Sequence, residues 1–265
     1  MEFNRRKYKE TLNLVKENNL NTICLEANCP NRYKCFSNST ATFMILGNIC
    51  TRNCGYCNVK HGKPKEVDEN EVERIVDAVK ILKLDYVVIT SVTRDDLEDG
   101  GARQFVAVIE ELKRIGCAVE VLIPDFLGKI DSLKKVIETE PDVINHNIEV
   151  VKSLFPKLRK QGDYERSVEV LRQINMSGVK SGLMVGFGES KEEVIECMRD
   201  LKSAGVEMLT IGQYLQPSSE HAEVVKYYSD EEFVEFGKIA KEMGFNVASG
   251  KLVRSSYNAR EMAGY

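Results

Sequence analysis

Three cysteines in the first quarter of the chain are the residues best suited to carry chemistry. Cys50, Cys54 and Cys57 form a CxxxCxxC pattern just after the apolar residues 42–46, and such a run is typical of a buried strand. A [4Fe–4S] cube held by protein alone is expected to have four cysteine thiolates. Three thiolates on one short loop therefore predict a cluster with one iron left open for another ligand.

The residue before the last of these cysteines is aromatic. With Tyr56 the stretch reads CxxxCx(aromatic)C, which resembles the signature of the radical S-adenosylmethionine (SAM) enzymes. In that superfamily the open iron chelates the cofactor. The resemblance implies that Cys50, Cys54 and Cys57 bind a [4Fe–4S] cluster that cleaves SAM, and that Tyr56 packs near its adenine.

Length and composition indicate an ordinary globular chain. Its 265 residues suit one or two domains, and 43% of them are hydrophobic and 29% charged. No stretch approaches the roughly 18 apolar residues of a membrane span, and residues 1–10 lack the apolar core of a signal peptide. We therefore expect a cytoplasmic protein that does not bind membranes.

The balance of charge argues against nucleic-acid binding. A formal net charge of −4 provides no global basic field. Three local basic clusters, at residues 5–9, 60–65 and 157–160, are expected to be solvated faces. Docking of an acidic protein partner remains the alternative.

The eight cysteines indicate metal binding rather than disulfides. Disulfide scaffolds are normally secreted and much shorter, whereas six of these cysteines lie within the first 57 residues of a long chain. Cys117 and Cys197 stand alone in apolar surroundings, and we interpret both as buried small hydrophobes.

A second cysteine triplet precedes the first. Cys24, Cys29 and Cys35 have the spacing CxxxxCxxxxxC, which differs from the paired CxxC arms of zinc ribbons. Pro30 within it argues against a continuous helix. We therefore place this triplet on a wrapped loop.

Strand and helix patterns alternate from residue 42 onward. Strands are predicted at residues 42–46, 86–90, 118–123, 142–147, 180–187, 207–214 and 245–249. Helices are predicted at residues 4–18, 69–83, 102–115, 133–138, 164–176, 192–204 and 230–243. Such alternation calls for a parallel sheet covered by helices. It favours an α/β fold with a partial (β/α)6-type TIM barrel, although an open sheet remains possible.

We expect three parts: an N-terminal arm at residues 1–41, a barrel at residues 42–250 and a C-terminal tail at residues 251–265. In α/β barrels the active site forms at the C-terminal ends of the strands. Polar residues gather at those ends in this sequence. They lie at residues 91–102, 124–126, 145–149, 182–189 and 212–214.

These stretches resemble the lipoyl synthase family over residues 24–257. The resemblance is carried by CLEANCPN, TSVTRDDLEDGGA, PDF, NHNIE, SGLMVGFGE, LTIGQYLQPS and VRSSY. It implies that Cys24, Cys29 and Cys35 bind an auxiliary [4Fe–4S] cluster whose fourth ligand is a serine of RSSY, for which we choose Ser256 over Ser255. A hydroxyl is a poorer partner for iron than a soft thiolate, which suits a cluster that is consumed as a sulfur source.

The resemblance also implies the reaction of a radical SAM sulfurtransferase. Two sulfur atoms enter at C6 and C8 of an octanoyl chain, which hangs from a lysine of a lipoyl carrier protein or domain. Such carbons offer no acidic proton, so cofactors rather than acid–base side chains do the hard chemistry. The other partners implied are an electron donor such as ferredoxin or flavodoxin, and an iron–sulfur carrier that rebuilds the consumed cluster.

Contacts to SAM follow by resemblance. Asn147 and Glu149 are similar to the Asn-x-acidic pair that holds the ribose in biotin synthases, and Lys180 is expected to pair with the methionine carboxylate. A run of small and polar residues resembles the GxIxGxxE pattern of radical enzymes and would let backbone approach the adenine. Its members are Gly182, Met184, Gly186 and Glu189. Glycines that serve strand packing alone remain the alternative.

Other polar residues receive weaker assignments. We expect a hydrogen-bonded structural role for His146, and a salt-bridged loop or a substrate contact for Arg94, Asp95 and Asp96. His61 and His221 receive no role. Three positions depart from the usual family residues: Lys251 and Ser229 replace proline, and Asn258 replaces histidine.

Three other functions compete with this interpretation. A biotin synthase-like enzyme would also insert sulfur, but CxxxxCxxxxxC and RSSY favour the lipoyl synthase family. A non-catalytic iron–sulfur electron carrier would not need the barrel-like remainder and would be expected to show sets of four cysteines. A zinc-stabilised interaction module predicts colourless tetrahedral sites.

Overall fold

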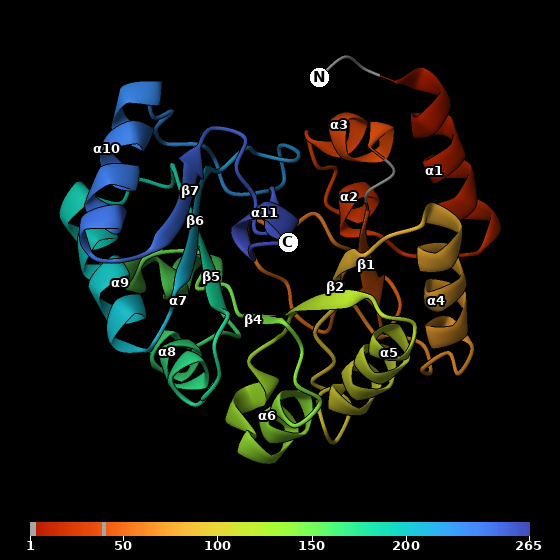
Figure 1. The fold of residues 1–265 in the computed structure, drawn as a ribbon. Coiled ribbons are helices and arrows are strands. Elements are labelled where there is room, and N and C mark those ends of the chain that lie inside the picture. Colours follow the sequence, from red (N-terminus) through yellow and green to blue (C-terminus); the bar gives the residue numbers. More distant parts are fainter. Residues whose placement is uncertain (1–3, 39–40) are drawn as a thin grey trace. The chain divides into compact units, whose positions relative to one another are not determined.

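The computed structural model describes residues 4–38 and 41–265 (Figure 1). Contacts divide the chain into two compact units. Unit 1 comprises Met1–Arg52, Asn58–Phe126 and Asp131–Pro141, and unit 2 comprises Asn53–Cys57, Leu127–Ile130 and Asp142–Tyr265. No helix among the described residues is both long and apolar enough to cross a membrane.

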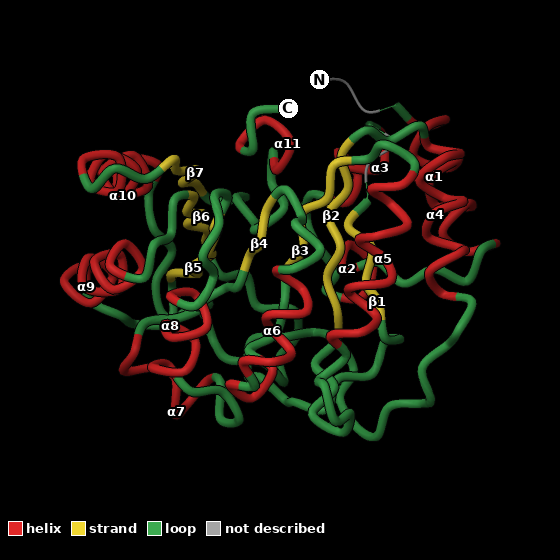
Figure 2. Tube along the Cα trace, turned by 60° about the horizontal axis from the view of Figure 1, so that its bottom comes forward, coloured by secondary structure: helices red, strands yellow, loops and turns green. Residues whose placement is uncertain are grey.

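Three parallel strands form the centre of unit 1. They are β1 (Thr42–Ile45), β2 (Tyr86–Ser91) and β3 (Ala118–Leu122), paired in sequence order. Helices α4 (Glu71–Leu82) and α5 (Ala102–Arg114) pack side by side and cover these strands (Figures 1 and 2). The strands are largely apolar because parallel strands are buried on both faces. Phe43, Ile45 and Ile89 are fully buried.

The N-terminal arm folds into three helices that pack within unit 1: α1 (Arg5–Glu17), α2 (Ile23–Glu26) and α3 (Arg32–Ser37). The Thr11 hydroxyl of α1 donates to the carbonyl of Phe36 at 3.1 Å, and the N–H of Met44 donates to the carbonyl of Asn21 at 2.9 Å. The wrapped loop expected around Cys24–Cys35 is therefore partly wrong. Pro30 does separate two helical segments, but each segment forms a short helix of its own.

Four parallel strands form the centre of unit 2. They are β4 (Val143–Asn145), β5 (Val179–Val185), β6 (Met208–Gln213) and β7 (Asn246–Gly250). The helices of this unit are α8 (Tyr164–Arg172), α9 (Lys191–Ser203) and α10 (Asp230–Glu242). Figure 2 shows α9 and α10 along one side of β5–β7.

Two capping boxes fix where the helices of unit 2 begin. The Ser190 hydroxyl accepts from the N–H of Glu193, whose carboxylate accepts from the N–H of Ser190. Ser229 and Glu232 repeat the arrangement at the start of α10. Such a box satisfies backbone donors that a helix start leaves open. Ser229, which departs from the usual proline, is thus the N-cap of α10.

The predicted fold class is confirmed, because all strand pairs within each unit are parallel and strands alternate with helices. The helix predicted at residues 133–138 begins earlier, as α6 (Ile130–Ile137), and the helix predicted at residues 164–176 ends at Arg172. Four short elements were not anticipated. They are η1 (Phe126–Gly128), η2 (Lys152–Leu154), α7 (Phe155–Leu158) and α11 (Ala259–Met262). The division into arm, barrel and tail stays a prediction.

Candidate functional site

The turn after β1 is held by a buried carboxylate from α4. Glu71 accepts hydrogen bonds from the N–H of Leu46 at 2.8 Å and of Gly47 at 3.2 Å, and from the Gln104 amide at 3.0 Å. Leu46 and Gly47 both have positive φ values, 69° and 87°. Burial raises the pKa of Glu71, although these donors lower it. Glu71 therefore fixes the direction in which the chain leaves β1 toward Cys50.

Arg52, two residues beyond Cys50, is the centre of a buried ion network. Its guanidinium bonds to Asp125 at 2.6 and 3.0 Å and to Asp95 at 2.7 and 2.9 Å. Burial alone would lower the pKa of Arg52, but the bonds to Asp95 and Asp125 outweigh it and raise that pKa. The N–H of Arg52 donates to the Cys50 sulfur at 3.4 Å. The network thus anchors the cysteine loop to the ends of β2 and β3.

The loop after β2 is salt-bridged within unit 1. Arg94 pairs with Asp96 at 2.9 Å and also donates to the carbonyl of Leu46. The N–H of Asp95 donates to the Thr51 hydroxyl at 3.1 Å. These contacts favour the salt-bridged loop over a substrate contact for Arg94, Asp95 and Asp96.

The second half of the cysteine loop is fixed inside unit 2. The N–H of Gly55 donates to the carbonyl of Leu158, and its carbonyl accepts from the N–H of Ala222, both at 2.8 Å. His221 Nε2 lies 3.1 Å from the carbonyl oxygen of Cys57, and its Nδ1 lies 2.9 Å from the Ser218 hydroxyl. Because a carbonyl only accepts, Nε2 carries the proton. His221 therefore holds the loop at its last cysteine.

Tyr56 is half-buried and packs its ring against Phe187, with ring centroids 6.3 Å apart. Phe187 in turn stacks on Tyr214 at 4.1 Å. Burial is the main cause that raises the pKa of Tyr56, and the Glu149 carboxylate adds to it. Tyr56 is thus a neutral aromatic surface close to the predicted ribose pair.

Asn147 and Glu149 form one hydrogen-bonded group after β4. The Asn147 amide donates to Glu149 Oε1 at 3.1 Å and to the Ser255 hydroxyl at 2.6 Å. Glu149 has a positive φ of 69°, and burial raises the pKa of its carboxyl. Asn147 Oδ1 is buried and makes no hydrogen bond with any residue that the structure describes. An acceptor of this kind needs a partner, and a ribose hydroxyl would satisfy it.

Arg159 supports the backbone of the Asn147–Glu149 segment. Its guanidinium donates to the carbonyls of Asn147 and Ile148 at 3.1 and 3.4 Å, and it lies over the ring of Phe155. Only 8% of Arg159 is exposed. The expectation that the basic cluster at residues 157–160 is a solvated face is therefore wrong for Arg159, because its guanidinium donates to two backbone carbonyls.

Glycines allow the C-terminal tail to pass directly over β5 and β6. A Cβ on Gly182 would lie 2.7 Å from Asn147 Oδ1, 2.9 Å from Thr210 Oγ1 and 3.0 Å from Ser255 Oγ. A Cβ on Gly212 would lie 2.2 Å from the carbonyl oxygen of Val253. Side chains alternate along a strand, so Lys180 and Met184 lie on the same face of β5 as Gly182. Lys180 is fully buried.

Most hydrogen bonds of the Glu189 carboxylate are with the backbone of its own loop. Its carboxylate accepts from the N–H groups of Gly186 at 2.7 Å and Phe187 at 2.9 Å, and from the Tyr228 hydroxyl at 3.0 Å. A Cβ on Gly186 would lie 2.3 Å from the Gln213 amide nitrogen. For Gly186 and Glu189 the packing alternative thus has direct support, and a cofactor contact of either residue stays a prediction.

The arm brings its three cysteines together. Cys24 is buried in α2, Cys35 lies in α3, and the N–H of Cys29 donates to the carbonyl of Cys24 at 3.2 Å. Burial above all, together with the charges of Cys35 and Cys29, raises the pKa of the Cys24 thiol to about 12. Cys29 and Cys35 therefore lie close enough to Cys24 in unit 1 to affect its pKa.

Thiol donors of this kind fit iron–sulfur clusters. All eight cysteines are free thiols, and the described residues contain no group of three His, Cys, Asp or Glu that could hold one metal ion. The thiolates of a cube each bind a different iron, so they need not converge on a point. A tetrahedral zinc site needs that convergence.

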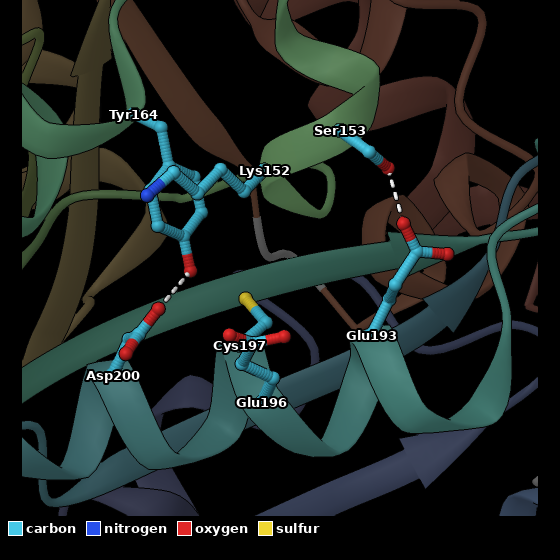
Figure 3. A pocket seen from close by; sticks show the side chains of 7 residues that line it. All are labelled: Lys152, Ser153, Tyr164, Glu193, Glu196, Cys197 and Asp200. Atoms are coloured by element: carbon cyan, nitrogen blue, oxygen red, sulfur yellow. Dashed lines mark hydrogen bonds between the residues drawn. The ribbon is translucent and has the colours of Figure 1, made fainter.

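A cavity of about 240 Å³ lies elsewhere in unit 2, beside α9 (Figure 3). The Tyr164 hydroxyl bonds to Asp200 at 2.9 Å within it. The seven residues that line it are Lys152, Ser153, Tyr164, Glu193, Glu196, Cys197 and Asp200. None of them is a predicted site residue. Cys197 and Cys117 are buried, at 2% and 4% exposure, as predicted.

Comparisons with known proteins agree with this arrangement. The family model described as the Radical SAM superfamily matches residues 44–201. Among solved structures, methylornithine synthase matches this chain with a TM-score of 0.60 at 15% identity. The match covers 91% of this chain and 69% of the methylornithine synthase chain. A maturase of the [FeFe]-hydrogenase matches with a TM-score of 0.58 at 13% identity. That match covers 97% of this chain and 74% of the maturase chain. These structures show the fold.

Curated relatives are far more similar. The lipoyl synthase of Caldicellulosiruptor saccharolyticus is 52% identical over 260 residues, covering 96% of this chain and 91% of that protein. The mitochondrial lipoyl synthase of Nematostella vectensis is 48% identical over 260 residues, covering 96% of this chain and 89% of that protein. The chain therefore belongs to the lipoyl synthase family of the radical SAM superfamily.

Proposed function

We propose that this chain forms lipoyl groups by inserting two sulfur atoms at C6 and C8 of an octanoyl chain attached to a lysine of a carrier protein. The observation that carries this function is that three free thiols, Cys24, Cys29 and Cys35, influence one another electrostatically in an arm that precedes the radical SAM loop. Family membership implies SAM and two [4Fe–4S] clusters as cofactors.

When bound, these groups supply reductive cleavage of SAM, the radical that removes a hydrogen atom from each carbon, and the sulfur atoms. The protein supplies ligands and placement. Cys50, Cys54 and Cys57 hold the cluster that cleaves SAM, and the anchors at Arg52 and His221 support the two halves of their loop. Three cysteine ligands would leave one iron of that cluster free to bind the cofactor.

The ribose of SAM is held by the group around Asn147. Oδ1 of Asn147 is the buried acceptor that a ribose hydroxyl would satisfy, and the Glu149 carboxylate accepts from a second hydroxyl. Tyr56 offers a flat apolar surface on the same side of unit 2, which suits the adenine. Lys180 is the predicted partner of the methionine carboxylate.

Ser256 is the proposed fourth ligand of the auxiliary cluster. Its hydroxyl makes no hydrogen bond with any residue in the described part of the chain, whereas the neighbouring Ser255 hydroxyl is engaged by Asn147. A free hydroxyl is available to a metal, and its hard oxygen binds cluster iron weakly. That weakness suits a cluster whose sulfur is given up.

The substrate partner is a lipoyl carrier protein bearing the octanoyl group. A ferredoxin or flavodoxin as electron donor, and an iron–sulfur carrier that restores the consumed cluster, are further proposals. We also propose a cytoplasmic location, although one relative is mitochondrial.

The function is tested by anaerobic reconstitution with iron, sulfide, SAM, a reductant and an octanoyl-lysine peptide, followed by mass spectrometry. We expect the peptide to gain two sulfur atoms. Replacement of Cys24, Cys29 and Cys35 by alanine should abolish this gain while cleavage of SAM continues.

The matched control replaces Cys117 and Cys197 by alanine. Both residues are buried and lie outside the two triplets, so this variant should retain product formation. Sulfur insertion by the first variant in a single turnover would contradict the donor assignment. No cleavage of SAM by the unaltered protein would instead favour an electron carrier.

A further inference from the structure

The side-chain amide of Asn147 has an orientation that its neighbours determine. Glu149 Oε1 lies 3.1 Å from Nδ2, and a carboxylate can only accept. The NH2 group of Asn147 must therefore face Glu149. Its second proton goes to the Ser255 hydroxyl at 2.6 Å, which leaves Oδ1 as the buried acceptor without a partner among the described residues.

Ser255 reaches this position because the tail lies against bare backbone. A Cβ on Gly182 would come within 3.0 Å of Ser255 Oγ, so a side chain there would push the serine away. Arg254 donates to the carbonyl of Val253 at 2.6 Å, and the N–H of Val253 donates to the carbonyl of Gly250 at 3.0 Å. The tail is thus folded back so that Ser255 meets Asn147.

We propose that Ser255 is a positioning residue for SAM, acting through Asn147. By accepting one Nδ2 proton it holds the amide so that Oδ1 faces the ribose, and it thereby links docking of the C-terminal tail to occupancy of the SAM site. This inference rests on the proposed function, since that function assigns the ribose to Asn147 and Glu149.

The link works in both directions. If the docked tail strengthens SAM binding, then bound SAM must stabilise the docked tail by the same factor. Ser256, the proposed cluster ligand, is the next residue in the sequence. The RSSY motif therefore divides its work: Ser255 serves the SAM site, and Ser256 serves the auxiliary cluster.

The test measures SAM binding to the reconstituted protein by anaerobic calorimetry, with iron and sulfide counted in each sample. Ser255→Ala should weaken SAM binding by about threefold to tenfold, which corresponds to the loss of one hydrogen bond, and should retain the full iron content. The matched control is Ser249→Ala, whose hydroxyl donates to the carbonyl of Phe233 at 2.7 Å and does not contact Asn147. It should bind SAM as the unaltered protein does.

A second measurement follows the C-terminal tail directly. Hydrogen exchange of the amides at residues 253–257 in the reconstituted protein should slow when SAM is added, and Ser255→Ala should remove that protection. Equal SAM affinity for Ser255→Ala and the unaltered protein would overturn the proposal. The same holds if SAM does not change the hydrogen-exchange rates of the tail amides in the unaltered protein. Loss of auxiliary iron in Ser255→Ala would overturn it too, because Ser255 would then be the cluster ligand.

These readouts do not depend on product formation. A protein that makes no lipoyl product but shows coupled SAM binding and tail protection would contradict the proposed function alone. A protein that makes lipoyl with an uncoupled tail would contradict this inference alone.

Discussion

The guanidinium of Arg52 and the carboxylate of Asp125 form a bidentate ion pair, with hydrogen bonds of 2.6 and 3.0 Å. Only 3% of the arginine side chain and none of the aspartate side chain is exposed. Paired bonds between planar groups are among the strongest polar contacts in proteins. Because Arg52 directly follows Cys50 and Thr51, this pair fixes the first part of the cysteine loop.

Replacing Arg52 by methionine should destabilise the protein strongly. The change leaves Asp125 and Asp95 without their shared cation, and loss of one partner from a buried pair costs about 3–5 kcal/mol. For a chain of this size we expect the Tm to fall by about 10 °C, measured by anaerobic thermal unfolding of the reconstituted protein.

Arg103→Met is the matched control, because Arg103 also pairs with an aspartate, Asp99, but its side chain is 81% exposed. Exposed pairs contribute little, so its Tm should change by at most about 2 °C. Equal shifts in the two variants would show that the Arg52 network does not hold the loop.

Glu71→Ala should loosen the turn after β1. The change leaves the N–H groups of Leu46 and Gly47 buried without their acceptor, and an unsatisfied buried donor costs about 1–3 kcal/mol. We expect a Tm lower by about 5 °C and a lower yield of the reconstituted radical SAM cluster, counted as iron per chain. Glu73→Ala, in the same first turn of α4 but exposed, should change neither quantity. An unaltered Tm for Glu71→Ala would be the contrary result.

The sequence predicted what depends on local pattern. The strands and the longer helices were anticipated because apolar periodicity lies within the element that it defines. The roles of the cysteine triplets and of the Asn147–Glu149 pair were assigned from short motifs and stay predictions. All of these signals can be read without knowledge of distant contacts.

The supporting residues could not be read in this way. Arg159 lies in a basic run that looks solvated, and its burial depends on the carbonyls of Asn147 and Ile148, which belong to another segment. His221 had no motif, and its partner is the backbone of Cys57, 164 positions away. Ser255 bonds to Asn147 across 108 positions. Single-sequence patterns carry no information about such pairs.

His221→Ala should weaken retention of the radical SAM cluster. The imidazole holds the carbonyl of Cys57 at 3.1 Å, and without it the last cysteine of the loop samples more positions. We expect iron to be released to a chelator about threefold to tenfold faster, as for one lost hydrogen bond, measured by absorbance under anaerobic conditions.

His61→Ala provides the comparison. His61 is exposed and pairs with Cys50 through its backbone, which alanine preserves, so iron release should be unchanged. Equal rates for His221→Ala and the unaltered protein would remove His221 from the support of the loop.

Gly212→Ala should displace the C-terminal tail while leaving the barrel strands intact. The added Cβ would lie 2.2 Å from the carbonyl oxygen of Val253 and 3.3 Å from an Arg254 nitrogen, and backbone cannot yield to such an overlap without moving away. Amides at residues 251–257 should therefore exchange faster, and the tail should be cleaved sooner in limited proteolysis. Gly237→Ala is the control. Gly237 lies in α10, and its added Cβ would make an ordinary 3.4 Å contact with Ser249 of β7. Within a helix, alanine is more favourable than glycine by about 1 kcal/mol. If tail exchange were as slow in Gly212→Ala as in Gly237→Ala, the close passage of the tail over β6 would be contradicted.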